Sequence, residues 1–269
     1  LKSASPLPLT FNISLANGAS GYIPPPEQHA LGGYTTWPAR TAGLEINAEP
    51  RIVKATLKLL ERASGLSKKK YTEPLSPYAR VVMASRPVAY WRLGEQAGSI
   101  AVDSTANGHN ANYKSGIAFH LPGYGEPAAG EAHASRAAHF AGGRVLAEVP
   151  AAEAFTVEFW LWNGAIKSQH GRDTCVLELA GLHLRIFEGT NVDEPVLTIV
   201  PGRVGRATIA PRQWHHVAVV ARPDNHQLWL NGLKHLDEKR EPKLNESTRS
   251  MKLVLGGSED GIIDFAGKL

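Results

Sequence analysis

Oxygen-bearing side chains gather in the stretch 103–110, which reads Asp-Ser-Thr-Ala-Asn-Gly-His-Asn. Carboxylate, amide and backbone carbonyl oxygens are the ligands that calcium prefers in proteins. We therefore predict a calcium site with Asp103 and Asn107 as ligands, and Asp260 and Asp264 are weaker candidates of the same kind. The alternative is an Asx turn that joins two strands without a metal ion.

Aromatic side chains in the stretch Phe155–Trp162 form a second group that could bind a ligand. Trp160 and Trp162 point to one side of a predicted strand, and the apolar residues that alternate with them point to the other. Exposed aromatic rings can stack on sugar rings. The favoured interpretation is packing, because a sandwich buries the inner faces of its two sheets. The residues on the opposite side are Phe155, Val157, Phe159 and Leu161.

Two histidines and the single cysteine are assigned structural roles. His215 and His216 are adjacent on a predicted strand, so their side chains point to opposite faces and cannot hold one metal ion. Cys175 lies in an apolar run and is predicted to be a small buried side chain rather than a nucleophile. A single cysteine also excludes a disulfide within the chain.

Several chemistries lack the residues that they need. No predicted strand carries the closely spaced carboxylates of a glycoside hydrolase, and neither a Gly-x-Ser-x-Gly elbow nor a phosphate-binding loop occurs. The formal net charge is +4, and the basic residues are scattered apart from Lys68–Lys70, whereas a nucleic-acid site needs a concentrated basic patch. No apolar run is long enough to span a membrane. The chain as given is therefore predicted not to be an enzyme, a nucleic-acid-binding protein or a membrane-spanning protein.

The elements that carry these residues are predicted to be strands. Two apolar runs within Trp214–Lys234 flank the turn cluster Pro223–Asn225, and the second run ends at Asn231–Gly232, a pair typical of a type I′ turn. Further short strands, separated by turn residues, predict a mainly β fold, an antiparallel sandwich. They are expected at Val88–Leu93, Ala137–Phe140, Phe155–Trp162, Cys175–Leu179, His183–Phe187, Val196–Val200, Gly205–Ile209 and Met251–Leu255.

Residues 1–66 differ in sequence pattern from the strand-rich part that follows, and we predict a small α+β fragment there. Phe11–Leu15 is a candidate strand, and Pro24–Pro26 is expected to prevent regular structure. Apolar positions recur at helical spacing over Glu49–Ser64, with Gly65 just past the end. One helix and a proline-rich loop would bury little apolar surface by themselves.

Residues 67–80 are polar, contain two prolines and are predicted to be a linker to a second domain at 81–269. Five stretches of that second part, in order, are Val88–Glu95, Asp103–Asn110, Phe155–Trp162, Trp214–Lys234 and Leu255–Ser258. Through them the chain from 79 to 269 resembles the laminin-G-like (concanavalin A-like lectin/glucanase) family. The resemblance implies a jelly-roll sandwich, truncated at its end, with a calcium ion held by an aspartate such as Asp103. It also implies a glycan or protein ligand.

The first segment carries the stretches Leu15–Asn17, Gly21–Tyr22 and Pro26–Glu27, followed by Tyr34. In this order it resembles the end of the catalytic domain of neutral (non-lysosomal) ceramidases. The resemblance implies that Tyr34 helps to bind a catalytic zinc ion, whose two histidines and glutamate would lie upstream of Leu1. A catalytic zinc site needs about three protein ligands and an open position. The chain as given is therefore not expected to perform that reaction.

Three functions follow from these patterns. The favoured one is a non-catalytic module that binds a carbohydrate or a protein, attached to a hydrolase-like domain. The alternatives are a fragment of a zinc-dependent amide hydrolase and a purely structural domain of an exported protein. Both ends of the chain, at Leu1 and Leu269, look cut, so a missing signal peptide carries no information, and we expect a secreted, periplasmic or cell-surface protein.

Overall fold

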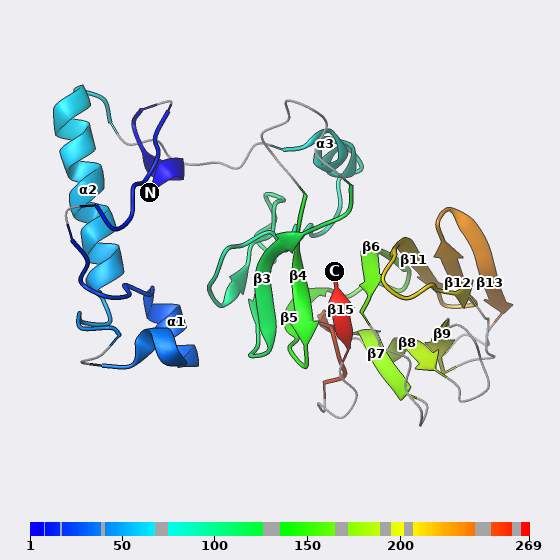
Figure 1. The fold of residues 1–269 in the computed structure, drawn as a ribbon. Coiled ribbons are helices and arrows are strands. Elements are labelled where there is room, and N and C mark those ends of the chain that lie inside the picture. The colour runs from blue at the N-terminus through cyan, green and yellow to red at the C-terminus, as the bar shows by residue number, and fades with distance from the viewer. Residues whose placement is uncertain are drawn as a thin grey trace. The chain divides into compact units, whose positions relative to one another are not determined.

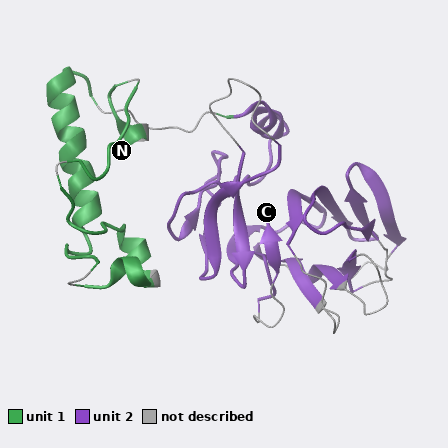
Figure 2. Cartoon of the chain, viewed as in Figure 1, with its two compact units in different colours: residues 1–75 green, residues 76–269 purple. Residues whose placement is uncertain are grey.

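The computed structural model in Figure 1 describes residues 1–7, 9–16, 18–38, 41–67, 75–125, 135–164, 172–188, 195–201, 207–239, 249–259 and 265–269. Within it, the chain forms two compact units, residues 1–75 and 76–269 (Figure 2). Helix α3 (Pro77–Ala84) spans the predicted end of the linker at residue 80. The division into a domain at 1–66, a linker at 67–80 and a domain at 81–269 stays a prediction.

Unit 1 is built around one long helix. This helix, α2 (Ala48–Ser64), was predicted at Glu49–Ser64, and it ends at Gly65, whose φ of 70° suits a residue without a β-carbon. The shorter elements are η1 (Lys2–Ala4), α1 (Pro26–Leu31) and η2 (Tyr34–Thr36). Two expectations were wrong. Pro26 begins α1 because proline is tolerated in the first helical turn, and Phe11–Leu15 form no strand in the described chain.

Unit 1 has a small core. Only Ala42, Ala48 and Leu57 are buried among its described hydrophobic residues. Large apolar side chains at alternate positions of the extended N-terminal stretch are exposed instead: Leu9, Phe11, Ile13 and Leu15. This agrees with the expectation that the first segment buries little apolar surface by itself.

Unit 2 is a sandwich of two antiparallel sheets, which confirms the predicted fold class. The eight-stranded sheet has the order β1-β2-β5-β14-β7-β8-β9-β10, and the seven-stranded sheet has the order β13-β12-β11-β6-β15-β4-β3. The strands are β1 (Ile100–Ala101), β2 (Ala111–Tyr113), β3 (Ile117–Pro122), β4 (Arg136–Ala141), β5 (Val145–Pro150), β6 (Phe155–Asn163), β7 (Arg172–Leu179), β8 (Leu182–Glu188), β9 (Val196–Val200), β10 (Ala207–Thr208), β11 (Trp214–Arg222), β12 (Asn225–Leu230), β13 (Leu233–Lys239), β14 (Ser250–Leu255) and β15 (Ala266–Lys268).

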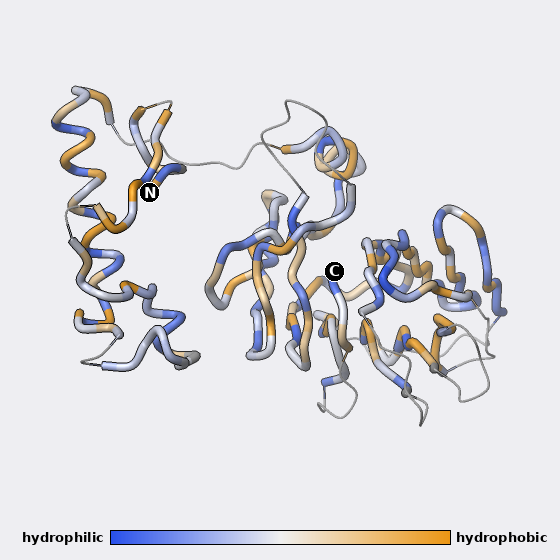
Figure 3. The backbone as a smooth tube through the Cα atoms, in the orientation of Figure 1, coloured by the Kyte–Doolittle hydropathy of each residue, from blue (hydrophilic) through white to orange (hydrophobic). Residues whose placement is uncertain are grey.

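The predicted hairpins of the seven-stranded sheet are confirmed. Pro223 and Asp224 join β11 to β12, and Asn231 and Gly232 join β12 to β13. Both residues of the second turn have positive φ, 50° and 81°, as a type I′ turn requires. Strand β13 lies at the edge of its sheet and is mostly hydrophilic (Figure 3). A strand predicted at Val88–Leu93 is absent, since this segment makes only an isolated bridge between Trp91 and Asp103.

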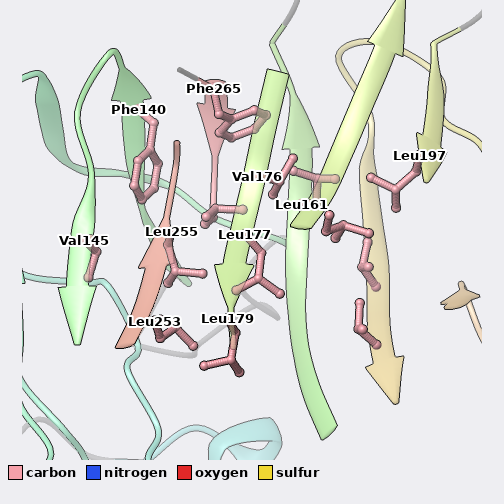
Figure 4. Packing of buried hydrophobic residues seen from close by; sticks show 14 of the residues in the cluster. Phe140, Val145, Leu161, Val176, Leu177, Leu179, Leu197, Leu253, Leu255 and Phe265 are labelled. Atoms are coloured by element: carbon pink, nitrogen blue, oxygen red, sulfur yellow. The ribbon is translucent and has the colours of Figure 1, made fainter. Parts of the chain in front are cut away.

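The core lies between the two sheets, where their inward-facing side chains meet (Figure 4). The predicted apolar face of Phe155–Trp162 points inward: Leu161 is fully buried, and Phe155, Val157 and Phe159 pack against the cluster. Burying one such side chain stabilises the fold by about 1.5–3 kcal/mol. The labelled residues of the cluster are Phe140, Val145, Leu161, Val176, Leu177, Leu179, Leu197, Leu253, Leu255 and Phe265.

Candidate functional site

Four of the six tryptophans lie on the outward face of the seven-stranded sheet. Residues that pair directly across neighbouring strands share one face. One row across β4, β15, β6 and β11 therefore consists of His139, Lys268, Trp162 and Trp214. Trp160 pairs with His216, and a third row across β6, β11, β12 and β13 consists of Glu158, Ala218, Trp229 and Lys234. We call the surface defined by Trp160, Trp162, Trp214 and Trp229 the tryptophan face.

These positions correct one interpretation of the sequence. Trp160 and Trp162 do not pack between the sheets. Their strand neighbours Leu161 and Asn163 are fully buried, whereas both indoles are half-buried and belong to the outward surface. Alternation along the strand identified the two faces correctly. Which face points outward depends on the pairing of β6 with β11 and β15.

Trp160 is surrounded by other rings. Tyr124 stacks on it with ring centroids 3.5 Å apart and planes 10° apart, and His216 meets it edge-on at 5.2 Å. On α3, burial raises the pKa of Tyr78, and a hydrogen bond from Trp160 opposes that effect. Nε2 of His216 lies 3.8 Å from a carboxylate oxygen of Glu158. The indole is thus held between aromatic groups, which limits its rotamers.

Trp162 lies beside two basic side chains. Nζ of Lys268 is 4.9 Å from the centre of the indole, which is cation–π distance, and it also donates a hydrogen bond of 3.4 Å to the carbonyl of Pro122. The His139 ring is 6.4 Å from Trp162. Burial, and then the charge of Lys268, lower the pKa of His139. Both effects favour the neutral imidazole.

Trp229 is fixed by a polar network at the sheet edge. Its indole N–H donates to Oε1 of Gln227 at 3.1 Å, and Nζ of Lys234 lies 5.9 Å from the ring centre. Asp237 accepts hydrogen bonds from Lys234, from Asn225 at 2.7 Å and from Gln227 at 3.4 Å. These donors, Lys234 first, lower the pKa of Asp237 to about 2. Flat rings beside amide and charged groups offer both stacking and hydrogen bonding to a polyhydroxylated ligand.

His215 and Cys175, for which the sequence predicted structural roles, are both buried. His215 is buried; its Nε2 lies 3.2 Å from the carbonyl oxygen of Ala210 and its Nδ1 lies 3.3 Å from the amide of Asn231. Cys175 is fully buried, and burial raises the pKa of its thiol to about 12. Both observations confirm the predicted structural roles, because a buried thiol with a raised pKa is a poor nucleophile.

The loop after Asp103 is organised by that carboxylate, which is almost fully buried. It accepts hydrogen bonds from the N–H groups of Tyr90, Thr105 and His109 and from the Thr105 hydroxyl, at 2.7 to 3.0 Å. Burial alone would raise the pKa of Asp103, but these hydrogen bonds together lower it. Asn107 donates from its amide to the carbonyl of Val88 at 2.8 Å.

A calcium site does not fit this arrangement without rearrangement. The two carboxylate oxygens of Asp103 offer about four lone-pair positions, and four protein donors already face them. In the described part of the chain, no three acidic, histidine or cysteine side chains form a group that could hold a metal ion. Calcium binding at Asp103 and Asn107 stays a prediction. The candidates Asp260 and Asp264 lie outside the described residues.

Tyr34, the predicted zinc ligand, is half exposed. Its hydroxyl is hydrogen-bonded to that of Tyr22, and this bond, ahead of burial, raises the pKa of Tyr34. The ring also meets Trp37 edge-on at 6.3 Å. In the described part of the chain, Tyr34 belongs to no group of three acidic, histidine or cysteine side chains that could hold a metal ion. The zinc role and the ceramidase resemblance stay predictions.

No helix in the described ranges has the length and apolar character needed to cross a membrane.

Comparison with known proteins gives a fold likeness at low identity. No family model and no curated protein sequence matches the chain. Domain 4 of AbnA, an extracellular arabinanase from Geobacillus stearothermophilus solved with arabinotriose, aligns over 67% of this chain and 87% of its own, with 16% identity and a TM-score of 0.43. A putative carbohydrate-binding protein from Bacteroides ovatus aligns over 43% and 35%, with 19% identity and a TM-score of 0.32. Sheep galectin-11 aligns over 41% and 87%, with 12% identity and a TM-score of 0.27. Likeness at this level does not establish a function.

Proposed function

We propose that unit 2 is a non-catalytic carbohydrate-binding module whose ligand lies on the tryptophan face. The observation that carries this proposal is the outward placement of four tryptophans on three neighbouring strands. Indoles present a large rigid surface at a small cost in side-chain entropy, and each has an N–H that can donate a hydrogen bond. The apolar side of a sugar ring packs on such a surface, while its hydroxyl groups reach the neighbouring polar groups.

Trp214 is the tryptophan best placed for stacking. Rings or cations of the chain lie against the other three indoles, at Tyr124, Lys268 and Lys234. No described aromatic or cationic group stacks on Trp214, and it pairs directly with Trp162 on the neighbouring strand. Among the described residues, Trp214 is therefore the indole of the face that no ring or cation of the chain contacts.

The carboxylates of this face are too far apart for glycoside hydrolysis. Glu158 on β6 and Asp237 on β13 are separated by three strand spacings, roughly 14 Å. A glycosidase holds its two carboxylates about 5–9.5 Å apart. Asp237 is also occupied by its three donors. These facts support binding without catalysis on this face.

The proposal is tested by screening the whole chain against immobilised plant, microbial and animal polysaccharides. We expect at least one to bind, and Trp214→Ala to weaken that binding at least about tenfold, since an aromatic contact and its buried area are lost. The matched control is Trp37→Ala, an exposed tryptophan of unit 1, which is expected to bind normally. If the folded protein binds no glycan, or binds equally well without Trp214, a structural or protein-binding role replaces this one.

A further inference from the structure

The basic side chains of the tryptophan face differ in their partners. Lys234 is paired with Asp237, and His216 lies 3.8 Å from Glu158. Lys268 lies on the interior strand β15, between His139 on β4 and Trp162 on β6, and has no acidic partner among the described residues. Within the described ranges, its ammonium group contacts the Trp162 ring and the carbonyl oxygen of Pro122.

Lys268 is the described side chain that carries a fixed positive charge beside Trp162. Burial and the charge of Lys268 lower the pKa of His139, the other basic group there, and so favour its neutral form. Trp162 and Trp214 extend from Lys268 in the same row, so a ring that packs on the indoles has a substituent within reach of the ammonium group. A half-buried cation without a counter-ion attracts an anion more strongly than a paired surface lysine does.

We propose that the ligand of the tryptophan face is an acidic glycan, one of whose carboxylate or sulfate groups binds Nζ of Lys268. This inference rests on the proposed carbohydrate-binding function and specifies the ligand class. In the complex, the sugar ring lies along Trp162 and Trp214, and its anionic group forms with Lys268 the ion pair that no described acidic residue makes. A charge-assisted hydrogen bond to an ammonium group is stronger than one between neutral groups.

The test compares glycans that differ only in charge. Isothermal titration of the full chain would use oligogalacturonate against its methyl ester, glucuronoxylan against unsubstituted xylan, and dextran sulfate against dextran. We expect the acidic member of at least one pair to bind at least about tenfold more tightly, a preference that weakens as salt rises. The uronate and sulfate pairs distinguish the two sources of the anionic group.

Variants at residue 268 locate the preference. Lys268→Gln is expected to bind the acidic and neutral members equally, whereas Lys268→Arg keeps the preference. Lys252→Gln removes an exposed lysine that is paired with Glu259 on the other sheet, and it serves as the control for a general loss of charge. Equal binding of acidic and neutral glycans by the wild type, or an unchanged preference in Lys268→Gln, would overturn the inference but leave the proposed function intact. Binding of no glycan at all would instead defeat the proposed function.

Discussion

The ring of Tyr124 lies flat against the indole of Trp160, with centroids 3.5 Å apart. It occupies the position that a stacked sugar would take on that side of Trp160. Tyr124 is itself 48% exposed, whereas Trp160 beneath it is less exposed. One tryptophan of the face is thus covered by a ring of the chain itself, whereas no described ring stacks on Trp214 in the next strand.

Removing this cover should expose Trp160. We expect Tyr124→Ala to lower the free energy of unfolding by about 1 kcal/mol, because one aromatic pair is lost, and to increase quenching of tryptophan fluorescence by acrylamide. Tyr22→Ala, which alters an aromatic contact in unit 1, serves as the control. Unchanged quenching in Tyr124→Ala would show that Tyr124 does not cover Trp160 in solution.

Gly256 is required by a close contact within the core. A β-carbon there would lie 2.1 Å from a ring carbon of buried Phe140, and the φ of Gly256 is 84°. We expect Gly256→Ala to destabilise unit 2 by about 3 kcal/mol through overpacking and backbone strain. Gly98 has a φ of 109° but nothing within 4 Å, so Gly98→Ala isolates the backbone effect. Equal losses in the two variants, measured by urea unfolding, would contradict the packing argument.

Asp103 should stabilise unit 2 in a pH-dependent way. Its pKa is lowered from the usual 3.8, so its contribution is full above about pH 4 and is lost as the pH falls through the lower folded value. Asp103→Asn replaces an acceptor by an amide that faces N–H donors, and we expect a loss of about 2–4 kcal/mol at pH 7. The difference from the wild type, followed by urea unfolding, should shrink below pH 4. A constant difference down to pH 2 would exclude this role.

The calcium prediction is checked by thermal unfolding with calcium and with a chelator. The four donors to Asp103 imply that chelation leaves the midpoint temperature unchanged. A midpoint that rises with calcium concentration, and does so less in Asn107→Ala, would show that the loop rearranges to bind the ion.

The parts of the fold that the sequence predicted depend on local signals. Asn231–Gly232 can form a type I′ turn wherever they occur, and the alternation of Phe155–Trp162 places Leu161 inside by period alone. The strand predicted at Val88–Leu93 was wrong because its β-forming residues bond to groups distant in the sequence. The Tyr90 N–H donates to the Asp103 carboxylate, and the Trp91 indole N–H donates to the carbonyl of His109.

The candidate site is less visible in the sequence because its rows join distant segments. His139, Lys268 and Trp162 become neighbours only when β15 inserts between β4 and β6, an order that no local pattern specifies. The hydropathy pattern likewise does not reveal that Lys234 pairs with Asp237 whereas Lys268 pairs with no acidic residue that the structure describes. The chemistry of each side chain could be predicted from the sequence. Which side chains lie together depends on the order of the strands in the sheet.

The most direct measurement is an NMR titration of the six indole N–H signals with the tightest-binding glycan of the panel. Each signal is assigned by a Trp→Phe variant. The account predicts that Trp162 and Trp214 shift most, that Trp160 and Trp229 shift measurably, and that Trp37 and Trp91 do not move. Shifts confined to Trp37 or Trp91 would contradict it, because the ligand would then bind away from the tryptophan face.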